Sequence, residues 1–350
     1  MKTVLLLGAG ASVAEAKALG VTEIDLPPTD ATFIKYMQNH GGNDYHSLYN
    51  YAKKELGIEF GSVSVSMEDI FNKIYFKSQD SIQDNLQDRR MFAGLVQILF
   101  KSIAISTGKI ASTSGPLYKI ISQLLNRSEL KDFSIVTFNY DLLVEKTLEF
   151  FKSDYLNLYS SYSLEGENIV PSLSDNYFPA KMGKESVSVL KLHGSLNWFR
   201  EWDYKQQRPI ETQVDEDKIH LYSGPEELNE FKLLIPDNGK DRFALMLPVV
   251  VPPIYDKRKY YNQVLKPVWS KSKALFRNVQ RIIFFGYSLP EADIKAQILL
   301  SSAIYNSDNT PEIHIINTDP SVCEHFAKKL PIKSLCYYRT VDEFINQNKN

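Results

Sequence analysis

The chain of 350 residues is long enough for one or two domains with a sizeable hydrophobic core. Its 43% hydrophobic and 23% charged residues are those of an ordinary globular protein, and the formal net charge of −2 indicates no general attraction to nucleic acid or an anionic membrane. Its two cysteines, Cys323 and Cys336, are too few for a four-thiolate zinc site or a disulfide scaffold and fit a reducing compartment.

The first predicted element is an apolar strand, Thr3–Leu7, which runs into the turn Gly8-Ala9-Gly10-Ala11-Ser12. Glycines in such a turn let the backbone approach a pyrophosphate, and the following helix directs its first N–H groups at the anion. Val13 stands where dinucleotide-binding dehydrogenases have a third glycine. The turn predicts nucleotide binding, with an ordinary strand-to-helix turn as the alternative. The apolar run is too short for a signal peptide or a membrane span, so we expect a cytoplasmic protein with no membrane partner.

Residues 31–114 are predicted to form a mostly helical insertion. Met67–Tyr75 and Met91–Ile105 carry apolar residues three and four positions apart, and Thr107–Pro116 is a loop of Gly, Ser and Thr that closes the region. We expect residues 1–30 and 115–350 to form the core domain. The helical insertion, left over from that core, is the candidate surface for forming oligomers.

Further short apolar runs predict strands, with helical patterns between them. The strands are Ser134–Phe138, Val187–Leu192, Leu247–Val251, Arg281–Phe285 and Ile313–Ile316, and the helices are Asp141–Phe151, Lys266–Asn278 and Asp293–Tyr305. Several of these strands lack alternation, which is typical of strands buried on both faces of a parallel sheet. The pattern predicts an α/β fold with a doubly wound, Rossmann-like parallel sheet, interrupted by a polar insertion at about residues 197–245.

Polar residues and glycines follow the predicted strands at their ends. They are Gly8, Asn139, Asp141, His193, Gly286, Ser288 and Asn317. Ligands of open α/β sheets bind beyond the carboxyl ends of the strands, so we expect these residues to converge on one crevice.

Each of these positions has a chemical interpretation and a structural alternative. The amide of Asn139 should face the crevice, whereas Asp141 could instead cap the following helix. A histidine such as His193 is the usual general base near neutral pH. Gly286 permits close approach of a ligand and Ser288 can donate a hydrogen bond, but both also suit a simple turn before a helix. Asn317 or Asp319 could bind ribose hydroxyls or form an Asx turn.

Taken together, the ordered motifs resemble the sirtuin-like NAD-binding family. The motifs are Gly-Ala-Gly-x-Ser, Thr-Phe-Asn-Tyr-Asp, Leu-His-Gly-Ser, Gly-Tyr-Ser-Leu and a late Asn, and they span residue 2 to about residue 320. The chain is most similar to the bacterial branch that acts in antiphage defence. This resemblance implies a nicotinamide dinucleotide, NAD, as substrate.

The resemblance also implies residue roles. Gly8, Ala9, Gly10 and Ser12 match the phosphate turn, and Gly286 and Ser288 match the loop that holds phosphates and ribose. Asn139 matches the residue that positions chemistry at the nicotinamide ribose, Asp141 the contact to the nicotinamide carboxamide, and His193 the catalytic histidine. Asn317 matches the Asn near the adenosine ribose, and Asp30 is the candidate acid in the loop that lines the nicotinamide pocket.

The sequence departs from protein-deacylating sirtuins in one respect. Those enzymes carry a four-cysteine zinc module between the catalytic histidine and the Gly-x-Ser loop, whereas Asn197–Leu245 contains no cysteine. The resemblance therefore implies NAD hydrolysis to ADP-ribose and nicotinamide, without a metal, rather than deacylation. An unregulated NAD hydrolase would poison its own cell, so we expect a controlled defence effector. The family suggests a homo-oligomer, in some systems with a HerA-like ATPase or another defence partner, and a phage-derived trigger.

Three other interpretations stay open at the level of sequence. The chain could be a deacylase or ADP-ribosyl transferase, or a sensor that binds NAD or ADP-ribose without turnover. It could also be a dehydrogenase, with Val21–Leu26 as a second strand and Asp25 as its ribose-binding acid. The missing third glycine and Pro27-Pro28 argue against the dehydrogenase. The presence of Asn139, Asp141 and His193 argues against a site without activity.

Overall fold

The protein is represented by a computed structural model of the 350-residue chain. The structure describes residues 1–60, 65–79, 86–127, 132–151, 169–171, 187–203, 208–209, 219–221, 232–237, 240–261, 265–305 and 310–348.

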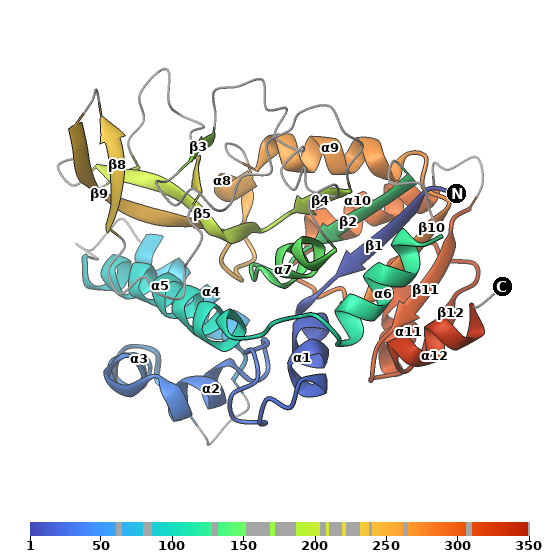
Figure 1. The fold of residues 1–350 in the computed structure, drawn as a ribbon. Coiled ribbons are helices and arrows are strands. Elements are labelled where there is room, and N and C mark those ends of the chain that lie inside the picture. The colour runs from blue at the N-terminus through green and yellow to red at the C-terminus, as the bar shows by residue number, and fades with distance from the viewer. Residues whose placement is uncertain are drawn as a thin grey trace.

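A six-stranded parallel sheet lies at the centre of the described part of the chain (Figure 1). Its strands are β1 (Thr3–Leu7), β2 (Phe133–Thr137), β4 (Ser188–Lys191), β10 (Arg281–Phe285), β11 (Glu312–Ile316) and β12 (Cys336–Tyr338). The order across the sheet is β12-β11-β10-β1-β2-β4, and each neighbouring pair is parallel. This is the order of a doubly wound fold, with the switch point between β1 and β10, and it confirms the predicted fold class.

The register of the strands brings their carboxyl ends to one edge of the sheet. Leu7 of β1 pairs with Thr137 of β2 on one side and with Phe285 of β10 on the other. All five residues of β1 and of β2 are buried, as expected for strands covered on both faces. The loops that follow β1, β2 and β10 therefore begin side by side.

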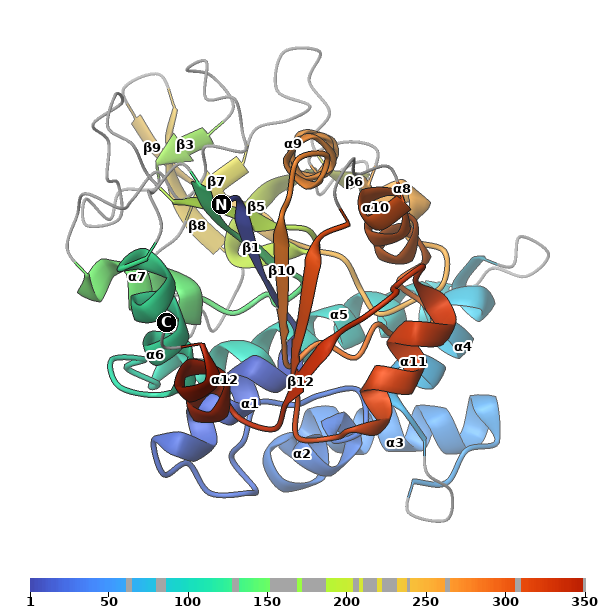
Figure 2. The same ribbon diagram turned by 90° about the vertical axis from the view of Figure 1, so that its right-hand side faces the viewer.

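Helices cover both faces of this sheet (Figure 2). They are α1 (Ala9–Ala18), α6 (Pro116–Leu125), α7 (Leu143–Phe150), α9 (Lys266–Phe276), α10 (Ile294–Tyr305), α11 (Ser321–Lys329) and α12 (Val341–Gln347). Helices α6, α7 and α12 lie on one side of the sheet and α10 and α11 on the other. Among these helices, α6 contacts α1, α7 and α12, and α9 contacts α10.

The segment between α1 and α6 is helical. It contains α2 (Phe33–His40), α3 (Gly42–Leu56), α4 (Met67–Gln79) and α5 (Leu86–Gly108). These helices share an apolar cluster that includes Phe33, Phe71 and Leu99 and continues to Leu196 and Phe199. The division into a core domain and a separate insertion stays a prediction.

A second sheet, mostly antiparallel, contains β5 (Gly194–Asp203), β7 (Ile219–Leu221), β8 (Lys232–Asp237) and β9 (Lys240–Val250), with β3 (Ile169–Pro171) and β6 (Arg208–Pro209) attached. The prediction that Leu247–Val251 is a strand of the parallel sheet was wrong. Most of that run is the end of β9, which pairs antiparallel with β5. A short apolar run cannot by itself distinguish the two environments.

Within the described ranges, α5 is the one helix that is long and apolar enough to cross a membrane by length and composition. A third of its most apolar window is buried, and α5 packs against α4 and α3. Core helices of proteins without a membrane segment pass the same test.

Candidate active site

The turn after β1 packs directly on the turn after β10. The N–H of Gly8 donates to Phe285 O at 3.1 Å, and the N–H of Gly10 donates to Gly286 O at 2.9 Å. A Cβ atom added at Gly8 would lie 2.6 Å from Gly286 O, and one added at Gly286, where φ is +63°, would lie 2.1 Å from Ala11 N. All three glycines are therefore required by backbone packing at the switch point.

Two N–H groups of the predicted phosphate turn are engaged within the protein. The N–H groups at the start of α1 were expected to face an anion, but that of Gly10 is used by Gly286 O and that of Ala11 by Gly8 O at 2.9 Å. The glycines thus serve contact between two turns, whether or not a pyrophosphate also approaches. The assignment of Gly8, Ala9 and Gly10 to phosphate binding stays a prediction.

A hydrogen-bonded network joins the end of β2 to the start of α1. Asn139 Nδ2 donates to Gly8 O at 2.9 Å and to Ser12 Oγ at 3.0 Å. Ser12 Oγ in turn donates to Asp141 Oδ2 at 2.6 Å, and Asp141 Oδ1 accepts from the N–H of Leu143 at 3.1 Å. Asp141, which is 6% exposed, therefore orients Ser12 and also forms an Asx turn with the first N–H of α7. The structure brings Gly8, Ser12, Asn139 and Asp141 together, as the sequence predicted.

Asn139 is half-buried and keeps one hydrogen-bonding group for a ligand. Both of its side-chain bonds use the amide nitrogen, so neither engages Oδ1. An oxygen fixed in this way can accept a hydrogen bond from a water molecule or a sugar hydroxyl.

His193 lies beyond β4 in a layer of aromatic rings. Its ring centroid is 5.0 Å from that of Phe138, which stacks on Tyr287 at 4.6 Å, and 6.4 Å from that of Tyr140. The layer connects the loops after β2, β4 and β10. Burial lowers the pKa of His193 to about 4, so the imidazole is neutral at pH 7.

Two charged residues beside His193 were not predicted from the sequence. Asp293, at the start of α10, places Oδ1 3.5 Å from His193 Nε2. The same oxygen accepts a hydrogen bond from the ammonium of Lys257, and Tyr287 OH donates to Oδ2 at 3.3 Å. Asp293 and Lys257 are 4% and 6% exposed. Although burial opposes ionisation, His193, Lys257 and Tyr287 together hold the pKa of Asp293 below its usual value.

The sequence held a weak signal for Asp293. It is an acid at the start of a helix, seven residues after the strand-end glycine Gly286. That position suits an N-terminal cap, which is its ordinary interpretation. Lys257 gives no local signal, since it lies in a loop before the short helix α8 (Arg258–Tyr261) and reaches Asp293 only through the fold.

Acidic residues of the helical segment approach the same place. Asp30 Oδ1 accepts from the N–H of Glu68, near the start of α4, at 2.8 Å, so Asp30 caps that helix. Burial, and then the charge of Asp30, raise the pKa of Glu68 to about 7, while Lys257 opposes the shift. The geometry thus gives Asp30 a structural role, and its predicted place in a nicotinamide pocket stays a prediction.

A buried ion pair lies beneath the loop that carries Asn139. Lys191 Nζ is 2.9 Å from Glu145 Oε1, and both side chains are at most 1% exposed. The same ammonium donates to the carbonyl oxygens of Tyr140 and Asp141. Lys191 therefore ties the backbone of that loop to β4.

Two predicted ribose ligands, Ser288 and Asn317, have no hydrogen bond to this network among the described residues. Ser288 is exposed, and the following Leu289 has φ +57°. Asn317 Oδ1 accepts from the N–H of Asp319 at 3.0 Å, which is the Asx turn that the sequence left open. Neither the exposure of Ser288 nor the Asx turn of Asn317 excludes ribose binding, and both roles stay predictions.

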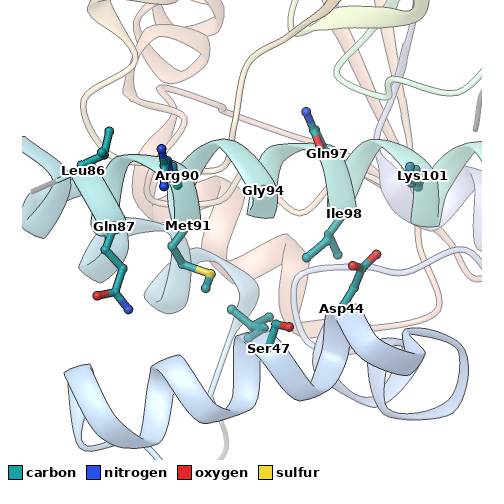
Figure 3. A pocket seen from close by; sticks show the side chains of 11 residues that line it. Asp44, Ser47, Leu86, Gln87, Arg90, Met91, Gly94, Gln97, Ile98 and Lys101 are labelled. Atoms are coloured by element: carbon teal, nitrogen blue, oxygen red, sulfur yellow. The ribbon is translucent and has the colours of Figure 1, made fainter. Parts of the chain in front are cut away.

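A cavity of about 570 Å³ lies elsewhere, between α3 and α5 (Figure 3). Met91 and Ile98 of α5 point toward α3, and Asp44 and Ser47 of α3 point toward α5. None of the predicted site residues lines it. The chemistry of the strand ends and this cavity are therefore separate features.

Comparison with known proteins identifies similar chains. A family model described as a SIR2-like domain matches residues 134–335, more than half of the chain. Solved structures that match include one from work on the structural basis of sirtuin substrate affinity, at 12% identity and a TM-score of 0.43, covering 99% of this chain and 91% of that chain. Another concerns the mechanism and regulation of Sir2 enzymes, at 12% identity and a TM-score of 0.42, covering 99% and 93%. A third is Sir2 with an inhibitor, 2′-O-acetyl-ADP-ribose and a deacetylated peptide, at 13% identity and a TM-score of 0.34, covering 99% and 91%. No curated protein sequence matches the chain.

Proposed function

The chain belongs to the SIR2-like family of NAD-dependent proteins, and we propose that it hydrolyses the bond between nicotinamide and ribose in NAD, releasing nicotinamide and ADP-ribose. The observation that carries this proposal is the Asn139 network together with the buried, neutral His193, whose ring contacts Phe138 and Tyr140 on either side of Asn139 in the chain. An amide oxygen that can accept from a water or hydroxyl and a base in its unprotonated form, which follow the neighbouring strands β2 and β4, suit attack on the anomeric carbon.

The reaction balances with water as the second substrate. The bond between the anomeric carbon and the nicotinamide nitrogen breaks, and its electron pair neutralises the ring, which leaves as neutral nicotinamide. The ribose passes through an oxocarbenium-like state, as in other glycoside cleavage. Asn139 Oδ1 orients the attacking water, and His193 accepts its proton, directly or through a ribose hydroxyl, before passing it to solvent.

The other residues of the site position these two. Ser12 and Asp141 fix the amide of Asn139, and Lys191 holds the carbonyl groups of the loop on which Asn139 and Asp141 stand. Such pre-organisation contributes to rate because the reacting groups need no rearrangement in the transition state. Asp141 has a second role in this proposal, because a carboxylate with two engaged oxygens still has lone pairs for a carboxamide N–H.

The experiment is to incubate purified chain with NAD in ¹⁸O-labelled water and to resolve the products by chromatography and mass spectrometry. We expect nicotinamide and singly labelled ADP-ribose from the wild type, and neither from Asn139→Ala or His193→Ala at unchanged thermal stability. Wild-type turnover by either variant would contradict the role assigned to the substituted residue. Labelled protein without free ADP-ribose would indicate a transferase, and saturable binding without products would favour a sensor.

The proposal includes control of the activity in the cell. His193, Asp141 and Asp293 are each at most 6% exposed, so little of the proposed machinery meets solvent. Because unregulated NAD hydrolysis would poison the cell, we propose a defence effector whose activity is raised by assembly, by a partner such as a HerA-like ATPase, or by a phage component. Cellular NAD should fall after phage infection with the wild-type chain and not with His193→Ala. An equal fall in both would exclude this chain as the cause.

A further inference from the structure

Asp293 is a buried carboxylate that the surrounding residues keep ionised. A charge of this kind is costly inside a protein unless partners replace its water shell, and here Lys257 and Tyr287 do so. Asp293 also lies at the start of α10, where the partial positive charge of a helix end favours an anion. The fold thus maintains an ionised carboxylate at the one place where it meets the imidazole.

We propose that Asp293 is a positioning residue that fixes the tautomer of His193, with the proton on Nε2 and the accepting lone pair on Nδ1. The inference rests on the proposed hydrolysis for its catalytic meaning, but not for its geometry. Nε2 is the nitrogen nearest Asp293 Oδ1, at 3.5 Å, and an anionic oxygen favours an N–H at that position. A histidine oriented in this way by a carboxylate presents its other nitrogen as the base.

The carboxylate of Asp293 also makes the buried His193 a stronger base. A buried imidazole is neutral at pH 7 but is a weak base, because burial penalises the imidazolium that forms when it accepts a proton. The negative charge of Asp293 raises the pKa of His193 and so offsets that penalty, whereas the positive charge of Lys257 lowers it. Lys257 therefore has two opposed effects, since it keeps Asp293 ionised and also weakens His193 as a base.

Among the described residues, four other titratable groups lie around His193 and Asp293. Tyr140 lies against the His193 ring and Tyr287 donates to Asp293. Glu68 and Asp30 lie on the side of the helical segment, where each charge acts on the other. Glu68 also interacts with Lys257 and Asp293. The backbone of the Lys257 loop is attached to the same segment, because the N–H of Tyr255 donates to Asn72 Oδ1 of α4 at 2.8 Å.

The first test needs no turnover. Nitrogen-15 NMR of the full chain labelled at histidine reports which ring nitrogen carries the proton, and the signal of His193 is identified by its absence in His193→Ala. We expect the Nε2–H tautomer in the wild type and a mixture or the other tautomer in Asp293→Asn, with Asp293→Glu restoring the first. An Nδ1–H tautomer in the wild type, or no change in Asp293→Asn, would overturn the proposal whether or not the chain cleaves NAD.

The second test separates positioning from folding. Asp293→Asn should lower kcat for NAD cleavage by about 10²- to 10⁴-fold with little change in KM, which is the range seen when an orienting carboxylate or a general base is lost. Lys257→Met should instead raise the pKa of His193, because a like charge is removed while Tyr287 and the start of α10 still favour an ionised Asp293. Asp342→Asn and Lys119→Met alter an exposed ion pair and serve as matched controls that change neither readout. An unchanged kcat in Asp293→Asn would contradict the proposal.

Should the wild type fail to cleave NAD while the tautomer results hold, the proposed function fails and the positioning of His193 by Asp293 stands.

Discussion

The hydroxyl group of Ser12 makes two hydrogen bonds that hold the site together. It donates to Asp141 Oδ2 and accepts from Asn139 Nδ2, so it joins a buried carboxylate to the amide proposed to orient water. The hydroxyl is 2.6 Å and 3.0 Å from these partners. Removal of this hydroxyl leaves Asn139 and Asp141 each without one hydrogen bond. Solvent water has little access to replace it, because Ser12 is only 4% exposed.

We therefore expect Ser12→Ala to cost about 1–3 kcal/mol of unfolding free energy, the usual cost of an unsatisfied buried polar group. It should also lower kcat for NAD cleavage by about 10- to 100-fold, since Asn139 loses one of two fixed contacts. Urea denaturation and product chromatography measure the two effects. Ser301→Ala, in the half-buried part of α10, is the comparison variant. A fully active Ser12→Ala would show that Asn139 does not depend on this network.

The residues that sequence reasoning found at this scale follow strands directly, as Gly8, Asn139 and His193 do. Their grouping was predictable because parallel strands end at one edge of a sheet. Asp293 and Lys257 were not found, because their function arises from a contact between a helix start and a loop 36 residues apart. No period or spacing in a single sequence records such a contact.

At the scale of elements, the contact between the β1–α1 turn and the β10–α10 turn fixes the switch point of the sheet. A Cβ at Gly286 would meet Ala11 N at 2.1 Å and the carbonyl carbon of Gly10 at 2.4 Å, and the residue has φ +63°. Backbone atoms cannot move aside as the end of a flexible side chain can.

Gly286→Ala should therefore lose more than about 2 kcal/mol of unfolding free energy, because backbone strain and a steric clash add. Gly20→Ala is the matched control, since Gly20 has φ +80° and nothing within 4 Å of an added Cβ. The control should show only the strain of a left-handed residue, about 1 kcal/mol. Chemical denaturation of both variants measures the difference, and equal losses would mean that the two turns separate easily.

The buried pair of Lys191 and Glu145 connects β4, α7 and the loop after β2. Burial raises the pKa of Glu145, and Lys191 opposes that shift. Glu145 Oε2 has no hydrogen-bond partner among the described residues, so Lys191 is the main compensation for this charge.

Lys191→Met should cost about 3–5 kcal/mol, the range for removing one partner of a buried pair. Adding Glu145→Leu should recover part of this stability, because no buried charge then remains. It should not recover NAD cleavage, because the carbonyl groups of Tyr140 and Asp141 still lack their donor. Thermal melts and product assays on the single and double variants separate the two roles, and recovery of both together would reduce Lys191 to a stability residue.

How far the elements could be predicted depended on their length and surroundings. β1 and β10 have the bounds that their apolar runs indicated, and α5 extends the predicted Met91–Ile105 at both ends. β12 has only three residues and lies at the edge of the sheet, so it carries no apolar run to detect. The polar region at 197–245 gave no clear period, although β8 and parts of β5 and β9 lie in it.

At the scale of the whole molecule, the helical segment combines attachment to the site with exposed apolar side chains, of which Leu86 and Ile105 lie on α5. It is tied to the core by the bond from Tyr255 to Asn72 of α4 and by the shared apolar cluster. α5 has a mean hydropathy of 1.4 over its most apolar window but only 33% of that window is buried, and Ile105 is 59% exposed. The cavity beside it is lined by Met91, Ile98 and Leu48.

Exposed apolar surface of this kind commonly marks an interface, because covering it removes apolar area from water. We propose that a second copy of the chain covers α5, in keeping with the expected homo-oligomer. Ile105→Glu should then lower the oligomeric state measured by light scattering after size exclusion, because the interface would have to bury a charge. Ile298→Glu, on α10 and 62% exposed, is the matched control and should leave the oligomer intact. Dissociation by the control alone would move the interface to α10, and a wild-type monomer at all concentrations would exclude the oligomer. Because α4 carries both Glu68 and the attachment of the Lys257 loop, dissociation should also change the rate of NAD cleavage, and an unchanged rate would separate assembly from control.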